Sequence, residues 1–117
     1  AETSMKTLIP YMEQSPSAVT SWIAAVDFLR SNSQEVVLIG DDSDSVISEM
    51  KRELRSKFEP NRVLAGAAAG LSKSGDSPLL KDRDQVDGKS TAYVCENYAC
   101  KLPVTSAAEM REQLGLI

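Results

Sequence analysis

Apolar positions at helical spacing predict a first helix that begins near Ser15-Pro16. Serine is a favoured N-cap, and proline is tolerated in the first turn because its missing N–H would have no helical partner there. The apolar stripe of this helix, with residues every three or four positions, consists of Val19, Trp22, Ile23, Val26 and Leu29. We expect Trp22 to anchor the core. Stacking of its ring on a ligand is the alternative.

A continuous apolar run over residues 36–39 predicts a strand that is buried on both faces, as in a parallel sheet. Gly40 closes this strand, and a loop of capping residues over 41–45 leads into a second helix. Pro60 ends that helix. Its predicted apolar side consists of Val46, Ile47, Met50, Leu54 and Phe58.

Two more strands are predicted over residues 62–65 and 91–95, the latter after the turn signal Asp87-Gly88. Alternation along a strand sends its odd and even positions to opposite faces. In the later strand, one face therefore carries Thr91, Tyr93 and Cys95, and the other carries Ala92 and Val94.

A last helix is expected to begin at Thr105 or Ser106, with Glu109 in the place that a capping box requires and Gly115 as its stop. The order of elements predicts a small three-layer α/β domain. Its sheet is expected to be three-stranded and mainly parallel, with the first strand in the centre and helices on the flanks. We predict that this single domain spans residues 15–117, and that residues 1–14 are a linker or the frayed end of an upstream element.

Length and charge narrow the functional classes. At 117 residues, with 42% hydrophobic and 26% charged residues, the chain has the size and composition of one folded domain. Its net charge of −4 runs against nucleic-acid binding, which needs clustered basic residues. No apolar run reaches the roughly 20 residues of a membrane span, and residues 1–14 do not read as a signal peptide. We expect a monomeric, cytoplasmic chain that binds neither nucleic acid nor membrane.

Histidine is absent, which excludes Ser-His-Asp and Cys-His catalysis and histidine-containing zinc sites within this chain. No set of residues forms a complete active site. We therefore predict no catalytic residue and no cofactor, and an enzymatic activity is not expected of this chain alone.

The two cysteines, Cys95 and Cys100, are the sharpest chemical candidates. The leading interpretation is that both are structural thiols, because a cysteine at the end of a buried strand acts as a small core residue. The alternative is a disulfide or redox pair, since a tight loop can bring the two within bonding distance. Zinc binding is disfavoured because two soft ligands are too few.

A second candidate is the acidic loop that contains Asp41, Asp42 and Asp44. Ligands of open α/β sheets bind beyond the carboxyl ends of the strands, and carboxylates there can hold a divalent ion. Helix capping and solubility are the competing interpretation, and they account for these residues without a ligand.

A sequence motif near the end of the chain resembles the C-terminal end of a family of long proteins. The motif consists of Gly88-Lys89-Ser90-Thr91-Ala92-Tyr93-Val94-Cys95, Cys100 and Pro103-Val104-Thr105. These are the thioredoxin-domain-containing proteins related to spermatogenesis-associated protein 20 and bacterial YyaL. The run over residues 35–40 and the helix at Ser15-Pro16 fit the same order.

This resemblance implies an α/β segment that follows a thioredoxin-like domain and a helical barrel similar to sugar epimerases. It also implies that residues 1–14 are the tail of the preceding helical domain. The family's Cys-x-x-Cys motif lies in its thioredoxin-like part, so no catalytic residue carries over to this chain. The resemblance implies an accessory domain that packs on the remaining domains of its parent chain. The alternatives are a part that contributes a thiol to a thioredoxin-linked oxidoreductase or sugar-modifying enzyme, and a metal or small-ligand module that uses the acidic loop.

Overall fold

The computed structural model describes residues 2–71 and 77–116, and the chain divides into two compact units, Ala1–Ser33 and Gln34–Ile117. The first unit holds helix α1 (Glu2–Gln14), the 3-10 helix η1 (Pro16–Val19) and helix α2 (Thr20–Arg30). Residues 2–14 are thus helical, despite Pro10 within the helix and the lack of a sustained apolar period. The expected extent of the α/β domain, residues 15–117, stays a prediction.

Trp22 does not anchor a core within its unit, because 42% of its surface is exposed. None of the described residues of α1 and α2 is buried. The apolar stripe predicted for this segment does form on a helix, after a short 3-10 turn that begins at Pro16. The expectation that its tryptophan is buried was wrong, because spacing predicts which side chains share a face but not whether that face is covered.

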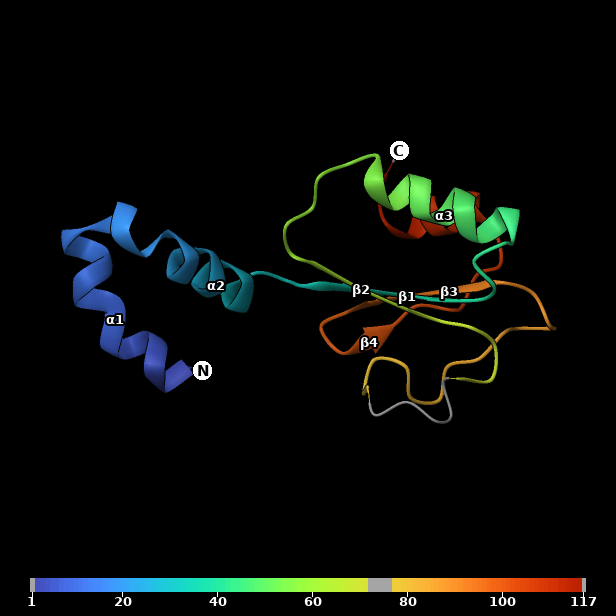
Figure 1. The fold of residues 1–117 in the computed structure, drawn as a ribbon, viewed down its shortest axis with the longest axis horizontal. Helices are drawn as coiled ribbons and strands as arrows, with labels where there is room; N and C mark the ends of the chain where they lie inside the picture. Colours follow the sequence, from blue (N-terminus) through green and yellow to red (C-terminus); the bar gives the residue numbers. More distant parts are fainter. Residues whose placement is uncertain (1, 72–76, 117) are drawn as a thin grey trace. The chain divides into compact units, whose positions relative to one another are not determined.

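The second unit is a mixed α/β domain (Figure 1). Among its described residues, four strands form one sheet in the order β2-β1-β3-β4. The elements, in chain order, are β1 (Gln34–Ile39), α3 (Ser45–Arg55), β2 (Arg62–Ala67), β3 (Thr91–Glu96), β4 (Ala99–Cys100) and α4 (Ala107–Gln113). No helix in the described part of the chain is long and apolar enough to cross a membrane.

The predicted three-stranded, mainly parallel sheet was wrong. Only β1 and β2 run parallel within the described sheet, whereas the pairs β1–β3 and β3–β4 are antiparallel. Because β1 and β2 are parallel, their C-terminal ends lie at the same end of the sheet. Strand β3 begins at that end, where Thr91 pairs with Ile39. A strand that begins beside the C-terminal end of β1 runs antiparallel to it, whereas a parallel strand needs a crossover connection to the other end.

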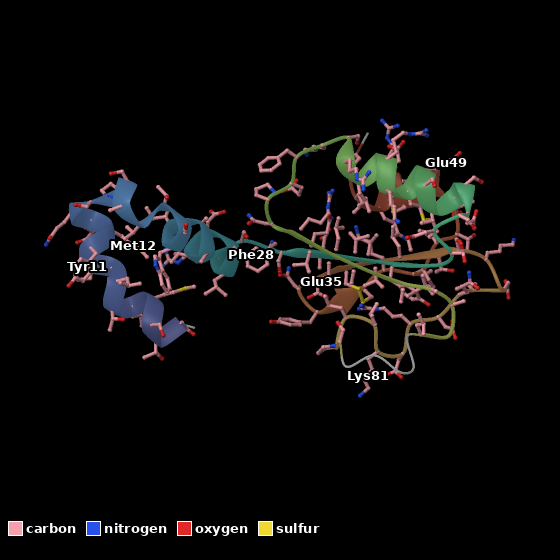
Figure 2. All side chains as sticks on the ribbon, viewed as in Figure 1. Tyr11, Met12, Phe28, Glu35, Glu49 and Lys81 are labelled. Carbon is pink, nitrogen blue, oxygen red and sulfur yellow. A yellow bond between two sulfur atoms is a disulfide. The ribbon has the colours of Figure 1, made fainter. Side chains whose placement is uncertain are left out.

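One face of the sheet packs on α3 and α4, which lie side by side above it in Figure 1. The buried core on this face consists of Val36, Leu38, Ile47, Met50, Leu54, Ala92, Val94, Met110, Leu114 and Leu116. The outward side of α3 is polar, as the exposed Glu49 in Figure 2 illustrates. The predicted alternation along residues 91–95 is confirmed, because Ala92 and Val94 point into this core.

Within the second unit, the opposite face of the sheet is covered by residues 77–90, which form no helix (Figure 1). The expected three-layer arrangement, which includes the helix of the first unit, stays a prediction. The Val86 amide donates to Thr91 Oγ1 at 2.9 Å, and the Tyr93 hydroxyl donates to the Asp84 carbonyl at 2.7 Å. Val37 and Ile39 are fully buried beneath this cover. The first strand is therefore buried on both faces, as predicted.

The predicted helix caps are confirmed at both helices of this unit. The Asp44 side chain accepts a hydrogen bond from the Val46 amide at 3.0 Å, and Ser106 Oγ accepts one from the Glu109 amide at 3.3 Å. Gly115 follows α4 with a φ of 67°. The prediction that α3 extends to Phe58 with this residue on its apolar side was wrong, because the helix ends at Arg55 and Phe58 is exposed.

Candidate functional site

The two cysteines face each other across the β3–β4 hairpin and form a disulfide, with their Cα atoms 3.9 Å apart. This differs from the leading expectation of two separate thiols. Pairing across an antiparallel ladder brings opposite side chains together on one face, which a spacing of five residues along the chain does not reveal by itself. A redox role for the pair stays a prediction.

A tight turn at Asn97 and Tyr98 produces this pairing. Both residues have positive φ angles, 50° and 64°, as a two-residue type I′ hairpin requires. Asparagine adopts this conformation more readily than an aromatic residue does, and Tyr98 is fully exposed at the tip. The turn sets the register that places Cys95 opposite Cys100.

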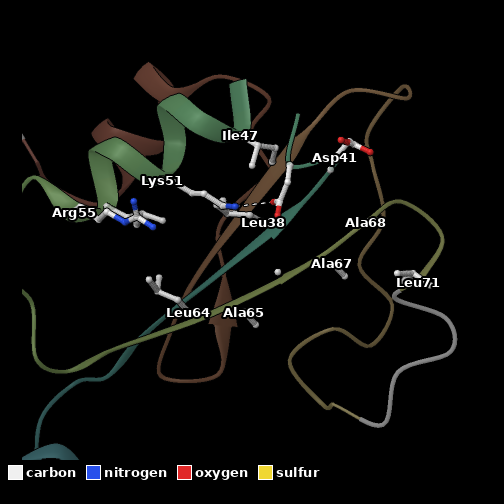
Figure 3. Close-up of a pocket in the computed structure, with 14 residues that line it drawn as sticks. Leu38, Asp41, Ile47, Lys51, Arg55, Leu64, Ala65, Ala67, Ala68 and Leu71 are labelled. Atoms are coloured by element: carbon white, nitrogen blue, oxygen red, sulfur yellow. Dashed lines mark hydrogen bonds and ion pairs between the residues drawn. The ribbon is translucent and has the colours of Figure 1, made fainter. Parts of the chain in front are cut away.

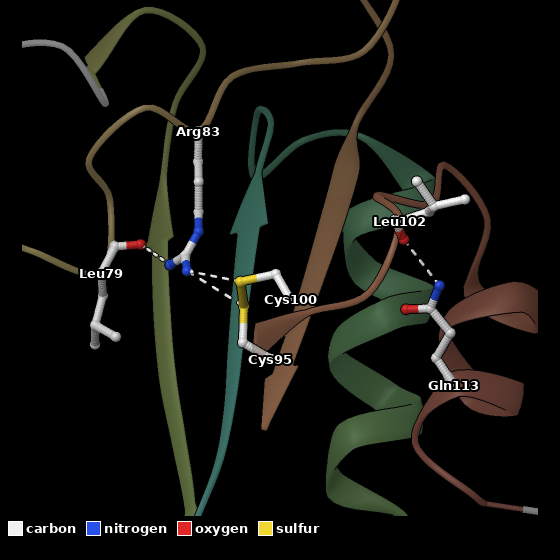
Figure 4. Close-up of a disulfide and its surroundings, with 6 residues drawn as sticks. All are labelled: Leu79, Arg83, Cys95, Cys100, Leu102 and Gln113. Atoms are coloured by element: carbon white, nitrogen blue, oxygen red, sulfur yellow. Dashed lines mark hydrogen bonds between the residues drawn. A yellow bond between two sulfur atoms is a disulfide. The ribbon is translucent and has the colours of Figure 1, made fainter. Parts of the chain in front are cut away.

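Arg83 belongs to residues 77–90, which cover this face of the sheet, and its side chain lies over the disulfide (Figure 4). Its Nη2 atom is 3.2 Å from the Cys95 sulfur and 3.3 Å from the Cys100 sulfur. Its Nη1 atom donates to the Leu79 carbonyl, and its guanidinium carbon lies 5.9 Å from the centre of the Tyr93 ring. A carbonyl and an aromatic ring therefore hold one positive charge against both sulfur atoms.

The two cysteines differ in their access to solvent. Cys95 belongs to the buried strand β3 and is 1% exposed, whereas Cys100 on the outer strand β4 is exposed. A reagent in solution therefore meets the Cys100 side of the bond first.

The outer strand continues past the disulfide. The Lys101 amide donates to the Val94 carbonyl at 2.9 Å, and Val104 exchanges two backbone hydrogen bonds with Ala92 at 2.8 and 3.0 Å. The register shifts by one residue between the disulfide and Val104, which marks a β-bulge in the outer segment. Backbone pairing thus anchors this segment independently of the sulfur–sulfur bond.

The acidic loop lies between β1 and α3, where each carboxylate has a different protein partner. Asp41 accepts hydrogen bonds from Ser43, at 2.6 Å from its hydroxyl and 2.8 Å from its amide, and these lower the pKa of Asp41. Asp42 accepts from Lys51 Nζ at 2.7 Å. Asp44 accepts from the Ser90 hydroxyl at 2.5 Å and from the Val46 amide, which lower its pKa in that order of importance.

These contacts fit the capping interpretation of the acidic loop. Among the residues that the structure describes, no group of three or more acidic or cysteine side chains is arranged to hold a metal ion. Ion binding by Asp41, Asp42 and Asp44 stays a prediction from the sequence.

A groove of about 720 Å³ lies next to this loop, between α3 and β2 (Figure 3). Its apolar lining includes Leu38, Ile47, Leu54 and Leu64, and Lys51 and Arg55 extend from α3 along it. Leu64 is 56% exposed and Gly66 is also exposed, so the helix-bearing face of β2 is open. The opposite side chains of β2, including Ala65, are partly covered.

Sequence reasoning missed Arg83 and Leu64. Arg83 belongs to a segment without a periodic pattern, so nothing along the chain connects it to residues 12 and 17 positions away. Leu64 was recognised as a strand residue, and its exposure depends on which strand forms the sheet edge. No pattern in the short run over residues 62–65 marks Leu64 as exposed.

Comparison with known proteins gives one kind of relative. The chain is 30% identical over 105 residues to spermatogenesis-associated protein 20 of Homo sapiens, and 28% and 27% identical to the proteins of that name from Rattus norvegicus and Mus musculus. The match covers 88% of this chain but 13% of each relative's length. No protein-family model and no solved structure matches the chain. The chain is therefore similar, along most of its length, to one segment of a much longer protein, and the predicted resemblance to spermatogenesis-associated protein 20 is confirmed.

Proposed function

We propose that this chain is an accessory α/β module of a longer, multidomain protein and that it packs on another part of that protein through the groove beside β2. The open helix-bearing face of β2, marked by the exposed Leu64, carries this proposal. Its interaction role requires no active site. The match to 13% of the length of spermatogenesis-associated protein 20 supports a long parent chain.

The coverage of the sheet supports the docking of another element on β2. The core beneath α3 and α4 takes its strand residues from β1 and β3, and none of its described members comes from β2. In the layered architecture of α/β proteins, a strand face is normally buried by a helix. The face of β2 that carries Leu64 and Gly66 lacks such a cover within the described unit.

The shape and charge of the groove favour an amphipathic helix with acidic residues beside its apolar stripe. Leu38, Leu54 and Leu64 offer apolar surface, and Arg55 offers positive charge in the same groove, where the Lys51 ammonium group is already paired with Asp42. An apolar stripe with flanking acids complements both features, as in other helix-in-groove contacts. In our proposal this helix belongs to the remainder of the parent chain.

The parent protein that we propose resembles the thioredoxin-domain-containing proteins, with YyaL as a bacterial example. This part of the proposal rests on the sequence motif of residues 88–95 and on the order of the predicted helices and strands along the chain. The sequence that precedes Ala1 in the parent chain tests it directly. A Cys-x-x-Cys domain followed by a helical repeat supports the proposal, and an unrelated architecture contradicts it.

Docking is tested with Leu64→Glu and the matched variant Leu102→Glu. Both variants introduce an acid at an exposed leucine. Leu102, which is 83% exposed, follows β4 at the sheet edge opposite to β2, away from the groove. The rest of the parent protein, produced as a separate polypeptide, is titrated with each variant by calorimetry. We expect Leu64→Glu to weaken binding by about thirtyfold, as for a central interface residue, and Leu102→Glu to leave it unchanged.

Hydrogen exchange locates the contact without a substitution. Docking predicts that the amides of residues 64–68 gain protection when the rest of the parent protein is added. Protection elsewhere with residues 64–68 unchanged, or equal binding by both leucine variants, contradicts the proposed surface. Circular dichroism of each variant distinguishes lost docking from lost folding.

A further inference from the structure

We propose that Cys95–Cys100 is a thiol–disulfide exchange site at which an external dithiol attacks the Cys100 sulfur and Cys95 leaves as a thiolate beside Arg83. The inference does not depend on docking at the β2 groove. It rests on the unequal exposure of the two cysteines and on the position of one guanidinium group against both sulfur atoms.

The exposure of the cysteines selects the attacked atom. Exchange begins when a thiolate approaches one sulfur of the disulfide, so access decides which sulfur is attacked. Cys100 lies on the exposed outer strand, whereas Cys95 is almost fully buried in β3. The incoming thiol therefore bonds to Cys100.

Arg83 favours the departure of Cys95. A neighbouring cation stabilises a thiolate, and a better-stabilised leaving thiolate departs faster. Arg83 Nη2 is 3.2 Å from the Cys95 sulfur before any bond breaks. The Leu79 carbonyl and the Tyr93 ring hold the guanidinium in place, so little reorganisation is needed as charge develops.

The reaction transfers two electrons from the dithiol to the protein. The first thiolate of the dithiol bonds to the Cys100 sulfur, and the bond between Cys100 and Cys95 breaks with its electron pair on Cys95. The second thiolate then attacks the mixed disulfide and releases Cys100. The products are an oxidised dithiol and two protein thiols, which take up the two protons that the dithiol lost.

The fold can accommodate both redox states because the outer segment has other anchors. The Lys101 amide remains bonded to the Val94 carbonyl, and Val104 remains paired with Ala92. Neither pair involves a sulfur atom. Reduction therefore frees the side chains of the cysteines while β3 keeps its outer neighbour.

The site of attack is tested by brief treatment of the oxidised 117-residue chain with reduced glutathione, followed by an acid quench, alkylation and peptide mass spectrometry. Glutathione bound to Cys100, with Cys95 alkylated, is the expected product. Glutathione on Cys95, or reaction solely under denaturing conditions, overturns the proposal.

The role of Arg83 is tested with dithiothreitol as the dithiol. The variants are Arg83→Gln, Arg83→Lys and the control Arg52→Gln, which removes a charge from the exposed side of α3. A unit charge a little over 3 Å away, screened as in water, changes the rate about tenfold, so Arg83→Gln is expected to slow native-state reduction by that factor. Arg83→Lys is expected to recover most of the rate, and Arg52→Gln to leave it unchanged.

The salt dependence of the reduction rate distinguishes an electrostatic role of Arg83 from a packing role. High ionic strength should reduce the rate advantage of the original chain and of Arg83→Lys over Arg83→Gln, because screening weakens the contribution of the Arg83 charge, whereas its effect on the approach of the thiolate is common to all variants. Equal rates and equal salt dependence in all variants overturn the role of Arg83. The unfolding midpoint of each oxidised variant shows whether the rates refer to folded protein.

Discussion

The Ser90 hydroxyl donates a 2.5 Å hydrogen bond to Asp44 Oδ2 and so joins the start of β3 to the N-cap of α3. Ser90 is 3% exposed, and the other oxygen of Asp44 accepts from the Val46 amide. One carboxylate therefore connects a helix cap with a strand that lies 46 residues further along the chain. The acidic loop therefore connects two distant elements, a role that the expected ion-binding, capping and solubility interpretations did not include.

This contact predicts acid sensitivity. The Ser90 hydroxyl, and next the Val46 amide, hold the pKa of Asp44 below its ordinary value of 3.8. Since the folded pKa is lower than the unfolded one, the unfolded state binds more protons in acid. The contribution of Asp44 is present above the unfolded pKa and is lost as pH falls through the folded pKa.

Urea unfolding between about pH 5 and pH 2 measures this effect. The Ser90→Ala variant should lose stability at neutral pH and show a shallower acid decline than the original chain. Ser48→Ala, on the exposed side of α3, serves as the control and should keep the original slope. Parallel acid curves for all three proteins contradict the assignment.

Gly40 is predicted to resist substitution because it lies against the same serine. A Cβ atom at Gly40 would lie 2.3 Å from Ser90 Oγ and 3.0 Å from the Ile47 side chain. Gly40→Ala should lower the free energy of unfolding by about 1–3 kcal/mol, as overpacking does. Gly66→Ala is the control, since its Cβ would lie 3.4 Å from the Leu38 carbonyl oxygen, an ordinary contact distance. Equal losses at both glycines would argue against a steric cause.

The disulfide is predicted to contribute modestly to stability because it closes a short loop. A sequence separation of five residues corresponds to a chain-entropy contribution of about 2 kcal/mol. The double variant Cys95→Ala/Cys100→Ala should unfold at lower urea concentration by that free energy and retain its circular dichroism spectrum. Loss of the folded spectrum at neutral pH would show that backbone pairing of residues 101–104 does not suffice to hold the outer strand.

Tyr98→Gly is predicted to stabilise the hairpin. The tyrosine has a φ of 64° and is fully exposed, so glycine relieves an unfavourable backbone conformation without loss of buried surface. An increase of about 0.5–1 kcal/mol in the free energy of unfolding is expected. Asn97→Gly should give a smaller gain, because asparagine adopts the left-handed region more readily. Thermal unfolding of the three proteins measures the order, and destabilisation by Tyr98→Gly is the contrary result.

The sequence by itself determined the elements that local chemistry specifies. The apolar run at residues 36–39 predicted a strand buried on both faces. The capping residues over 41–45, and Thr105 or Ser106, predicted where α3 and α4 begin. Alternation along residues 91–95 assigned side chains to the correct faces. These features depend on neighbours within a few residues, whose preferences can be read along the chain.

Only the tertiary structure decided how these elements are paired and covered. The direction of β3 follows from the end of β1 at which the chain re-enters the sheet, where Thr91 pairs with Ile39, and residues 77–90 have no periodic pattern that predicts this position. The same path brings Arg83 onto Cys95 and Cys100, and it leaves Leu64 exposed on the edge strand β2. Both candidate sites arise from contacts between distant parts of the chain, which local preferences do not specify.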